Sequence, residues 1–114
     1  MKGDAMYEMS REFVSTHVAG FEHWDGAEVA HKLKPGKKLR LKPESDNPYD
    51  PNAVMVFCGK TKIGYVPRAK NEVLAQLLHF GHGKVFEARV QSVNWACHPE
   101  RQVRMTIRVR DARS

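Results

Sequence analysis

The sequence predicts a small, mostly β domain: a six-stranded antiparallel barrel of the OB or SH3 type with two inserted helices. Short stretches with apolar side chains at every second position indicate half-buried strands. Turn-forming Gly, Pro, Asn and Asp residues separate these stretches, and two other segments carry apolar residues at helical spacing. With 114 residues, the chain has room for one domain with a modest core. We expect residues 1–11 to form a flexible tail and residues 12–111 to form this domain.

The first half of the chain is expected to supply four strands and a short helix. Alternating apolar residues predict strands over 12–19, 37–42, 53–57 and 62–66. Gly59 and Lys60 form the tight turn between the last two. Asp25 can cap a helix running through residues 29–33, with Glu28 at the third helical position as in a capping box.

The second half is expected to supply a longer helix and two strands. Pro67 opens a helix over residues 68–80, which ends at Gly81. Its apolar stripe consists of Val73, Leu74, Leu77, Leu78 and Phe80. A strand over residues 84–96 changes the parity of its apolar positions, which indicates a bulge near residues 91–92. The last strand, over residues 102–110, places Val103, Met105, Ile107 and Val109 inward.

The net charge favours an anionic partner. Nineteen Lys and Arg residues against thirteen Asp and Glu residues give a formal charge of +6. A basic domain without a membrane-binding helix is typical of nucleic-acid binding. No stretch approaches the roughly 20 apolar residues of a membrane span, and the first residues lack the apolar core of a signal peptide, so a cytoplasmic protein without a membrane partner is expected.

Two strands carry the basic residues on their polar side. Lys38, Arg40 and Lys42 alternate with apolar residues on one strand, and Arg104, Arg108 and Arg110 do so on the last. If the two strands share a face, these rows form a stripe that suits a phosphate backbone. The alternative is a solvated strand face, where Lys also blocks aggregation at a sheet edge.

The segment from Asn47 to Arg68 combines turn residues with groups that suit a nucleotide. Tyr49 and Tyr65 are rings on which a base can stack, Asp50 is an acceptor for a hydroxyl or base edge, and Arg68 is a cation for phosphate. On turn chemistry alone, Tyr49 would pack at the rim of the barrel and Asp50 would cap the turn.

This segment resembles the signature of the HIRAN domain family. The matching residues are Lys42-Pro-Glu-Ser-Asp-Asn-Pro-Tyr-Asp-Pro-Asn-Ala-Val54, followed by Ile63-Gly-Tyr-Val-Pro-Arg68. Looser similarity extends from about Phe13 to Val109. In helicase-linked members the domain binds the 3′ end of single-stranded DNA, so the resemblance implies an OB-like barrel with that ligand.

The resemblance also implies a role for each motif residue. Asn47 would hold the backbone or a base, and Tyr49 would stack on the terminal base. Asp50 would accept a hydrogen bond from the 3′-hydroxyl. Tyr65 and Arg68 would lie against a base and a phosphate.

The first strand departs from the family pattern. Helicase-linked members carry an Arg and adjacent Tyr residues before the glycine that matches Gly20, where this chain has Ser15-Thr-His-Val-Ala19. His17 can stack or pair with a phosphate, whereas Val18 cannot replace a tyrosine. Three residues of the following loop, Phe21, His23 and Trp24, are open as substitutes. The departure therefore bears on recognition of the strand end.

The sequence thus predicts a module that binds single-stranded DNA, including 3′-hydroxyl ends, in DNA repair or replication-fork processing. A helicase or nuclease is the expected partner enzyme. Two alternatives stay open: a protein-interaction module that binds a peptide of such a partner, and a binder of single-stranded RNA. No catalytic motif is present, so we expect no enzyme activity, cofactor or small-molecule substrate. His79, His82, Cys97 and His98 lack the paired spacing of a zinc site, so no metal is expected.

Overall fold

The computed structural model describes residues 10–111 and confirms the predicted fold class. Six antiparallel strands form one sheet in the order β1-β6-β5-β2-β3-β4. The strands are β1 (Ser10–His17), β2 (Lys38–Pro43), β3 (Val54–Cys58), β4 (Thr61–Tyr65), β5 (Phe86–Val93) and β6 (Val103–Arg110). Ser10 and Arg11 therefore belong to β1, and the rest of the predicted tail, residues 1–9, lies outside the described residues.

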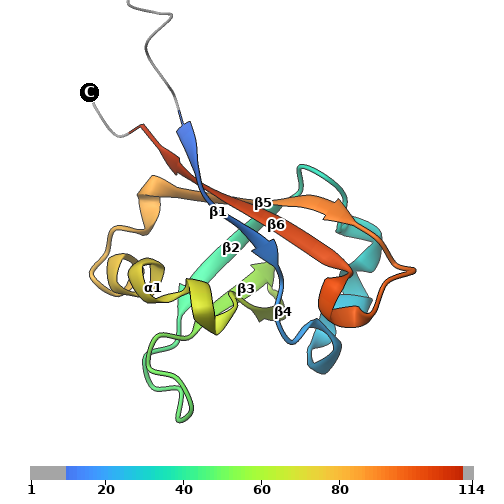
Figure 1. Ribbon diagram of the computed structural model, residues 1–114, viewed down its shortest axis with the longest axis horizontal. Helices are drawn as coiled ribbons and strands as arrows, with labels where there is room; N and C mark the ends of the chain where they lie inside the picture. The colour runs from blue at the N-terminus through green and yellow to red at the C-terminus, as the bar shows by residue number, and fades with distance from the viewer. Residues whose placement is uncertain (1–9, 112–114) are drawn as a thin grey trace, which may run out of the picture.

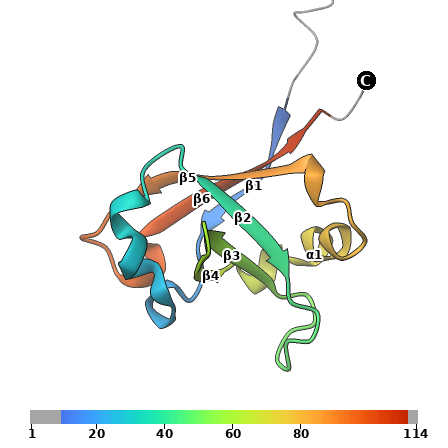
Figure 2. The ribbon, with the colours of Figure 1, turned by 180° about the vertical axis from the view of Figure 1, so that it is seen from behind.

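Strand β2 connects two halves of the sheet that lie across one another (Figures 1 and 2). Its first residues pair with β5, through Lys38–Arg89 and Leu39–Ala88. From Arg40 onward it pairs with β3 instead. The strand thus leaves one half of the sheet and enters the other, which gives the molecule the curled form of a small barrel.

A backbone pair between Ala19 and Tyr65 joins the two edges of this curled sheet. The N–H of Ala19, just past β1, donates to Tyr65 O at 2.8 Å, and the N–H of Tyr65 donates to Ala19 O at 2.9 Å. Gly64 makes this approach possible, because a Cβ at Gly64 would lie 2.4 Å from the Ala19 oxygen. The edge of β4 is therefore held by the chain that leaves β1.

The core lies inside the curl and under the helix. Its fully buried side chains include Ile63, Leu74, Met105 and Ile107. Strand β6 alternates as predicted, except that Val109 is only half-buried near the strand end. Strand β5 has its predicted bulge between Val90 and Ser92. A second bulge between Glu12 and Val14 in β1 was not predicted.

The predicted helix near residue 30 is a 3-10 segment, Asp25–Lys32, and Asp25 does not cap it. The cap position is Trp24, which makes no side-chain capping bond. Gly26 rests against the ring of Phe21, where a Cβ would come within 2.2 Å of a ring carbon, so this position has no room for a side chain. This segment lies at the opposite end of the sheet from α1 (Figure 1).

The second predicted helix is shorter than the pattern indicated. A 3-10 turn, Arg68–Lys70, precedes helix α1, which spans Glu72–His79. Eight residues give the helix one narrow buried face, centred on Leu74 and Ala75. The predicted stripe was therefore too wide: Val73 and Phe80 are exposed, Phe80 at 69%.

Candidate nucleic-acid interface

The loop after β2 is shaped by the side chain of Asn47. Its Oδ1 accepts from the N–H groups of Tyr49 (2.8 Å) and Asp50 (3.0 Å). Its Nδ2 donates to Glu44 Oε1 at 2.8 Å. These bonds are those of an Asx turn, in which a side chain replaces a backbone acceptor. The side chain of Asn47 therefore serves chiefly to fold the loop.

The loop forms one wall of a groove of about 680 Å³, which we call the motif groove. The other walls come from β4, the turn before α1 and the loop after β1. The five motif residues predicted to bind nucleic acid all line it; they are Asn47, Tyr49, Asp50, Tyr65 and Arg68. The structure thus brings together residues that are 21 positions apart in the chain.

Tyr49 presents an almost free aromatic ring at the mouth of this groove. The residue is 83% exposed. Its backbone is fixed, because Arg68 Nη2 donates to Tyr49 O at 2.9 Å. An exposed ring on a fixed backbone is the arrangement that a stacking platform needs.

Asp50 is held in place as an ionised acceptor. Its Oδ1 accepts from the N–H of Asn52 at 2.9 Å, and its Oδ2 accepts from Asn71 Nδ2 at 2.8 Å. The Asn71 hydrogen bond, helped by the Asn52 N–H and the Arg68 charge, lowers the pKa of the Asp50 carboxyl. A carboxylate accepts up to about four hydrogen bonds, so Asp50 retains capacity for a hydroxyl donor.

A second acid of the groove, Glu44, holds Tyr65. The Tyr65 hydroxyl donates to Glu44 Oε1 at 2.7 Å and accepts from Lys62 Nζ at 2.7 Å. Hydrogen bonds from Asn47 and Tyr65 lower the pKa of Glu44. Burial and the Glu44 carboxylate raise the pKa of Tyr65 to about 12. Tyr65 therefore stays neutral at physiological pH, and its ring is fixed in orientation.

Trp24, and not Phe21, is the aromatic residue that the loop after β1 adds to the groove. Trp24 is 40% exposed and lines the groove, whereas Phe21 is 5% exposed and belongs to the core. Lys62 Nζ lies 3.6 Å from the Trp24 ring centroid, a close cation–π contact. Trp24 also meets Tyr65 edge to face, with the centroids 5.9 Å apart.

The other predicted site residues do not line the motif groove; they are His17, Lys38, Arg40 and Lys42. His17 pairs with Arg104 on the β1–β6 side of the sheet. Arg40 is engaged locally, donating from Nε to Gly59 O at 3.1 Å and lying 5.2 Å from the Phe57 ring centroid.

The two predicted basic rows do not form one stripe. Strand β5 separates β2 from β6. Two of the β6 cations are bound to β1: Arg108 donates to the Ser10 hydroxyl at 2.9 Å, and Arg104 donates to Ser15 O at 3.4 Å. The outward alternation predicted for β6 is present, but Arg104 and Arg108 bond β1, because long Arg side chains on a strand inside the sheet reach across to the neighbouring strand.

Sequence reasoning missed three residues of the groove: Glu44, Lys62 and Asn71. Glu44 is the acid three positions before Asn47 in the quoted motif, so its spacing was a visible signal. Asn71 stands at the start of α1, where an Asn usually caps the helix. Its side chain instead bonds Asp50, a contact that no local pattern shows. Lys62 gave no signal beyond its place on a strand.

Neither a metal cluster nor a membrane-spanning helix is found in the part of the chain that the structure describes. Within residues 10–111, no three His, Cys, Asp or Glu side chains gather as metal ligands. No helix in this range is long and apolar enough to cross a bilayer.

The HIRAN domain family matches residues 12–110, which is nearly the whole chain and includes every residue of the motif groove. The chain belongs to the HIRAN domain family. HIRAN domains are nucleic-acid-binding modules and are not catalytic in themselves.

Two solved structures share the fold of this HIRAN domain. A crystal structure of a protein from Lactobacillus plantarum has a TM-score of 0.70 at 22% identity, covering 88% of this chain and 94% of that one. The HIRAN domain of human HLTF has a TM-score of 0.60 at 20% identity, covering 90% and 81%. A search of curated proteins gave no match. At sequence identities this low, the similarity to these two structures shows the fold alone.

Proposed function

We propose that this HIRAN domain binds single-stranded DNA in the motif groove and recognises a free 3′-hydroxyl end. The observation that carries the proposal is the pairing of Tyr49, a nearly free ring, with Asp50, an ionised acceptor next to it. A base stacked on the ring would bring its sugar toward the carboxylate. Recognition of a nucleic-acid end requires both a stacking surface and a hydroxyl acceptor.

Arg68 supplies the remaining element of the proposed site. Its guanidinium lies 3.9 Å from Asp50 Oδ2 and bonds the carbonyl of Tyr49. An Arg has five N–H donors, so donors remain for a phosphate beside the stacked base. Acting without catalytic groups, such a module would bring a helicase or nuclease partner to a DNA end during repair or fork processing.

The test is fluorescence anisotropy with a labelled ten-nucleotide DNA strand that ends in either a 3′-hydroxyl or a 3′-phosphate. We expect the free hydroxyl to bind about tenfold or more tightly, since a hydrogen bond to a charged group contributes about 1.5–3 kcal/mol. Asp50→Asn should abolish this preference while stacking on Tyr49 preserves binding. Glu28→Gln, an exposed acid outside the groove, is the matched control.

The outcomes separate the parts of the proposal. Equal binding of both oligonucleotides by the wild type would remove end recognition and leave a general single-strand binder. Tighter binding of the matching ribonucleotide strand would make RNA the ligand. Undetectable binding of every strand at low salt would contradict the nucleic-acid function of the groove.

A further inference from the structure

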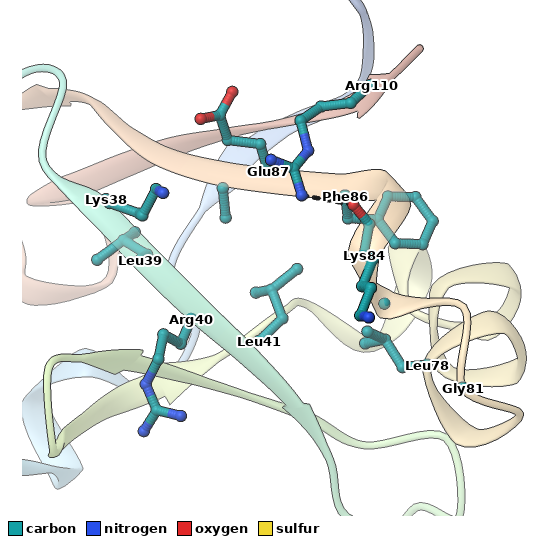
Figure 3. Close-up of a pocket in the computed structure, with 12 residues that line it drawn as sticks. Lys38, Leu39, Arg40, Leu41, Leu78, Gly81, Lys84, Phe86, Glu87 and Arg110 are labelled. Atoms are coloured by element: carbon teal, nitrogen blue, oxygen red, sulfur yellow. Dashed lines mark hydrogen bonds between the residues drawn. The ribbon is translucent and has the colours of Figure 1, made fainter. Parts of the chain in front are cut away.

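A second concavity, of about 410 Å³, lies between β2, β5 and the C-terminal end of α1 (Figure 3). We call it the β2–β5 cleft. It has no lining residue in common with the motif groove. Its size falls within the range of about 300–1,000 Å³ that is common for ligand sites. The cleft is therefore a separate candidate for binding.

The cleft exists because the β2–β5 ladder stops after two residue pairs. Continuing its register would set Leu41 opposite Phe86, but pairing ends at Leu39 and Ala88. In an antiparallel strand, alternate residues direct their N–H and C=O groups to alternate sides. The N–H of Val90 donates to Lys37 O, and the N–H of Glu44 donates to Ala53 O. Odd-numbered residues of β2 therefore bond toward β5, and even-numbered ones toward β3.

By this alternation, the backbone N–H and C=O of Leu41 face the cleft. Within residues 10–111, no strand pairs with Leu41 on that side. An unpaired strand edge is a template on which an extended chain can add a strand.

The side chains around the cleft combine an apolar floor with cations. Leu41, Leu78 and Phe86 form the floor. Lys84, between α1 and β5, and Arg110, at the end of β6, both line the cleft, and Arg110 Nη2 donates to the Lys84 carbonyl (Figure 3); both residues are exposed. Glu87, the acidic residue of the lining, forms an ion pair with Arg89, whose Nη2 lies 2.8 Å from Glu87 Oε2.

We propose that the β2–β5 cleft binds an extended peptide of alternating acidic and apolar residues from a partner protein. The peptide pairs with the free edge of β2 at Leu41. Because alternate side chains of a strand face opposite ways, one set enters the floor and the other meets Lys84 and Arg110. A nucleic-acid strand fits less well, since the aromatic ring in the lining, Phe86, is buried and offers no stacking surface.

The test is an NMR titration of the ¹⁵N-labelled chain with an eight-residue peptide in which Leu alternates with Asp and Glu. We expect saturable shifts of the amide signals of Leu41 and Phe86, with those of Tyr49 and Asp50 unchanged. The double variant Lys84→Glu/Arg110→Glu should weaken binding at least tenfold. Lys60→Glu/Arg101→Glu makes the same change of charge on exposed residues outside the cleft and should bind as the wild type does.

Three results would overturn the proposal. The first is no shift at the cleft at about 1 mM peptide, the weakest affinity of interest. The second is equal binding of a peptide with Ser in place of Leu, which would make the cleft a site for any polyanion. The third is displacement of the peptide by a DNA strand that shifts the same cleft signals, which would assign the cleft to the nucleic acid.

Discussion

At the scale of single residues, the motif loop divides its work between side chains that build it and side chains that face the groove. Asn47 uses three of its hydrogen-bonding positions within the loop. Tyr49 contributes its backbone to Arg68 and leaves its ring free. Asp50 does both, since it is bonded by Asn71 and still accessible from the groove. Substitutions here should therefore separate binding from stability.

Tyr49→Ala should weaken binding of single-stranded DNA by about 1–3 kcal/mol, the usual cost of losing one stacked base. Because the ring is exposed, the free energy of unfolding should change by less than about 0.5 kcal/mol. Anisotropy and urea denaturation measure the two quantities. Phe80→Ala, which removes an exposed ring outside both concavities, is the control and should leave affinity unchanged. An unaltered affinity in Tyr49→Ala would rule out stacking on this ring.

Asp50 should make stability depend on pH in the acid range. Its folded-state pKa lies below the ordinary value of 3.8, chiefly because Asn71 bonds the ionised form. The stabilisation is thus present above the unfolded-state pKa and is lost as the pH falls through the lower folded-state pKa. Urea denaturation from about pH 5 to about pH 2 should show a shallower loss of stability in Asp50→Asn than in the wild type. Asn71→Ala should also make the loss of stability with falling pH shallower. Stability curves parallel to that of the wild type would refute the coupling between Asn71 and Asp50.

At the scale of elements, the geometry of the groove depends on where β4 meets the chain leaving β1. The Ala19–Tyr65 pair fixes the backbone of Tyr65, while Glu44 and Lys62 fix its hydroxyl. Trp24 then packs against Tyr65 from the same connection. One close backbone contact therefore sets the positions of two aromatic residues in the groove, and Gly64 permits that contact.

Gly64→Ala should destabilise the domain and disturb the groove. The new Cβ would lie 2.4 Å from Ala19 O and 2.6 Å from a Val18 methyl carbon, and overpacking of this kind costs about 1–3 kcal/mol. Hydrogen exchange at the Ala19 and Tyr65 amides should accelerate. Gly59→Ala is the comparison. A Cβ at Gly59 has nothing within 4 Å, so this variant tests backbone strain alone. If Gly59→Ala destabilises the domain as much, the close approach at Gly64 is not the cause.

At the scale of the whole molecule, the cations are spread over several surfaces. Arg68 and Lys62 line the motif groove, whereas Lys38 and Arg40 line the β2–β5 cleft. The net charge of +6 therefore produces a positive potential over much of the surface, which attracts polyanions in general. Only a few of the cations lie at the proposed DNA site. The number of phosphates that the protein neutralises should then increase with the length of the strand.

The salt dependence of binding should show this increase. For a ten-nucleotide strand with roughly four to six phosphate contacts, log K should fall with log[salt] at a slope of about −3 to −4. A trinucleotide, confined to the groove, should show a slope nearer −1 to −2, on the basis of roughly 0.7 per phosphate. Lys42→Ala, which removes an exposed cation outside both concavities, should reduce only the slope of the longer strand. Equal slopes for both lengths would mean that the rest of the surface takes no part.

The sequence by itself determined the strand order along the chain, the bulge in β5 and the motif of the groove. These features have local causes: alternation with a period of two, turn residues at fixed positions, and an Asn whose side chain folds its own loop. The burial of Phe21 could not be predicted from the sequence, because Phe21 and Trp24 are both aromatic and stand three positions apart in one loop. The tertiary structure assigned one to the core and the other to the groove.

Tertiary structure alone decided how distant residues meet. Asn71 reaches Asp50 and Glu44 reaches Tyr65 across 21 positions each, and Arg104 and Arg108 donate hydrogen bonds to β1. The departure of β2 from β5, which opens the β2–β5 cleft, follows from the curl of the whole sheet. Local periodicity specifies which side of a strand is apolar, whereas long-range packing decides which polar side chains become partners and which stay free for a ligand.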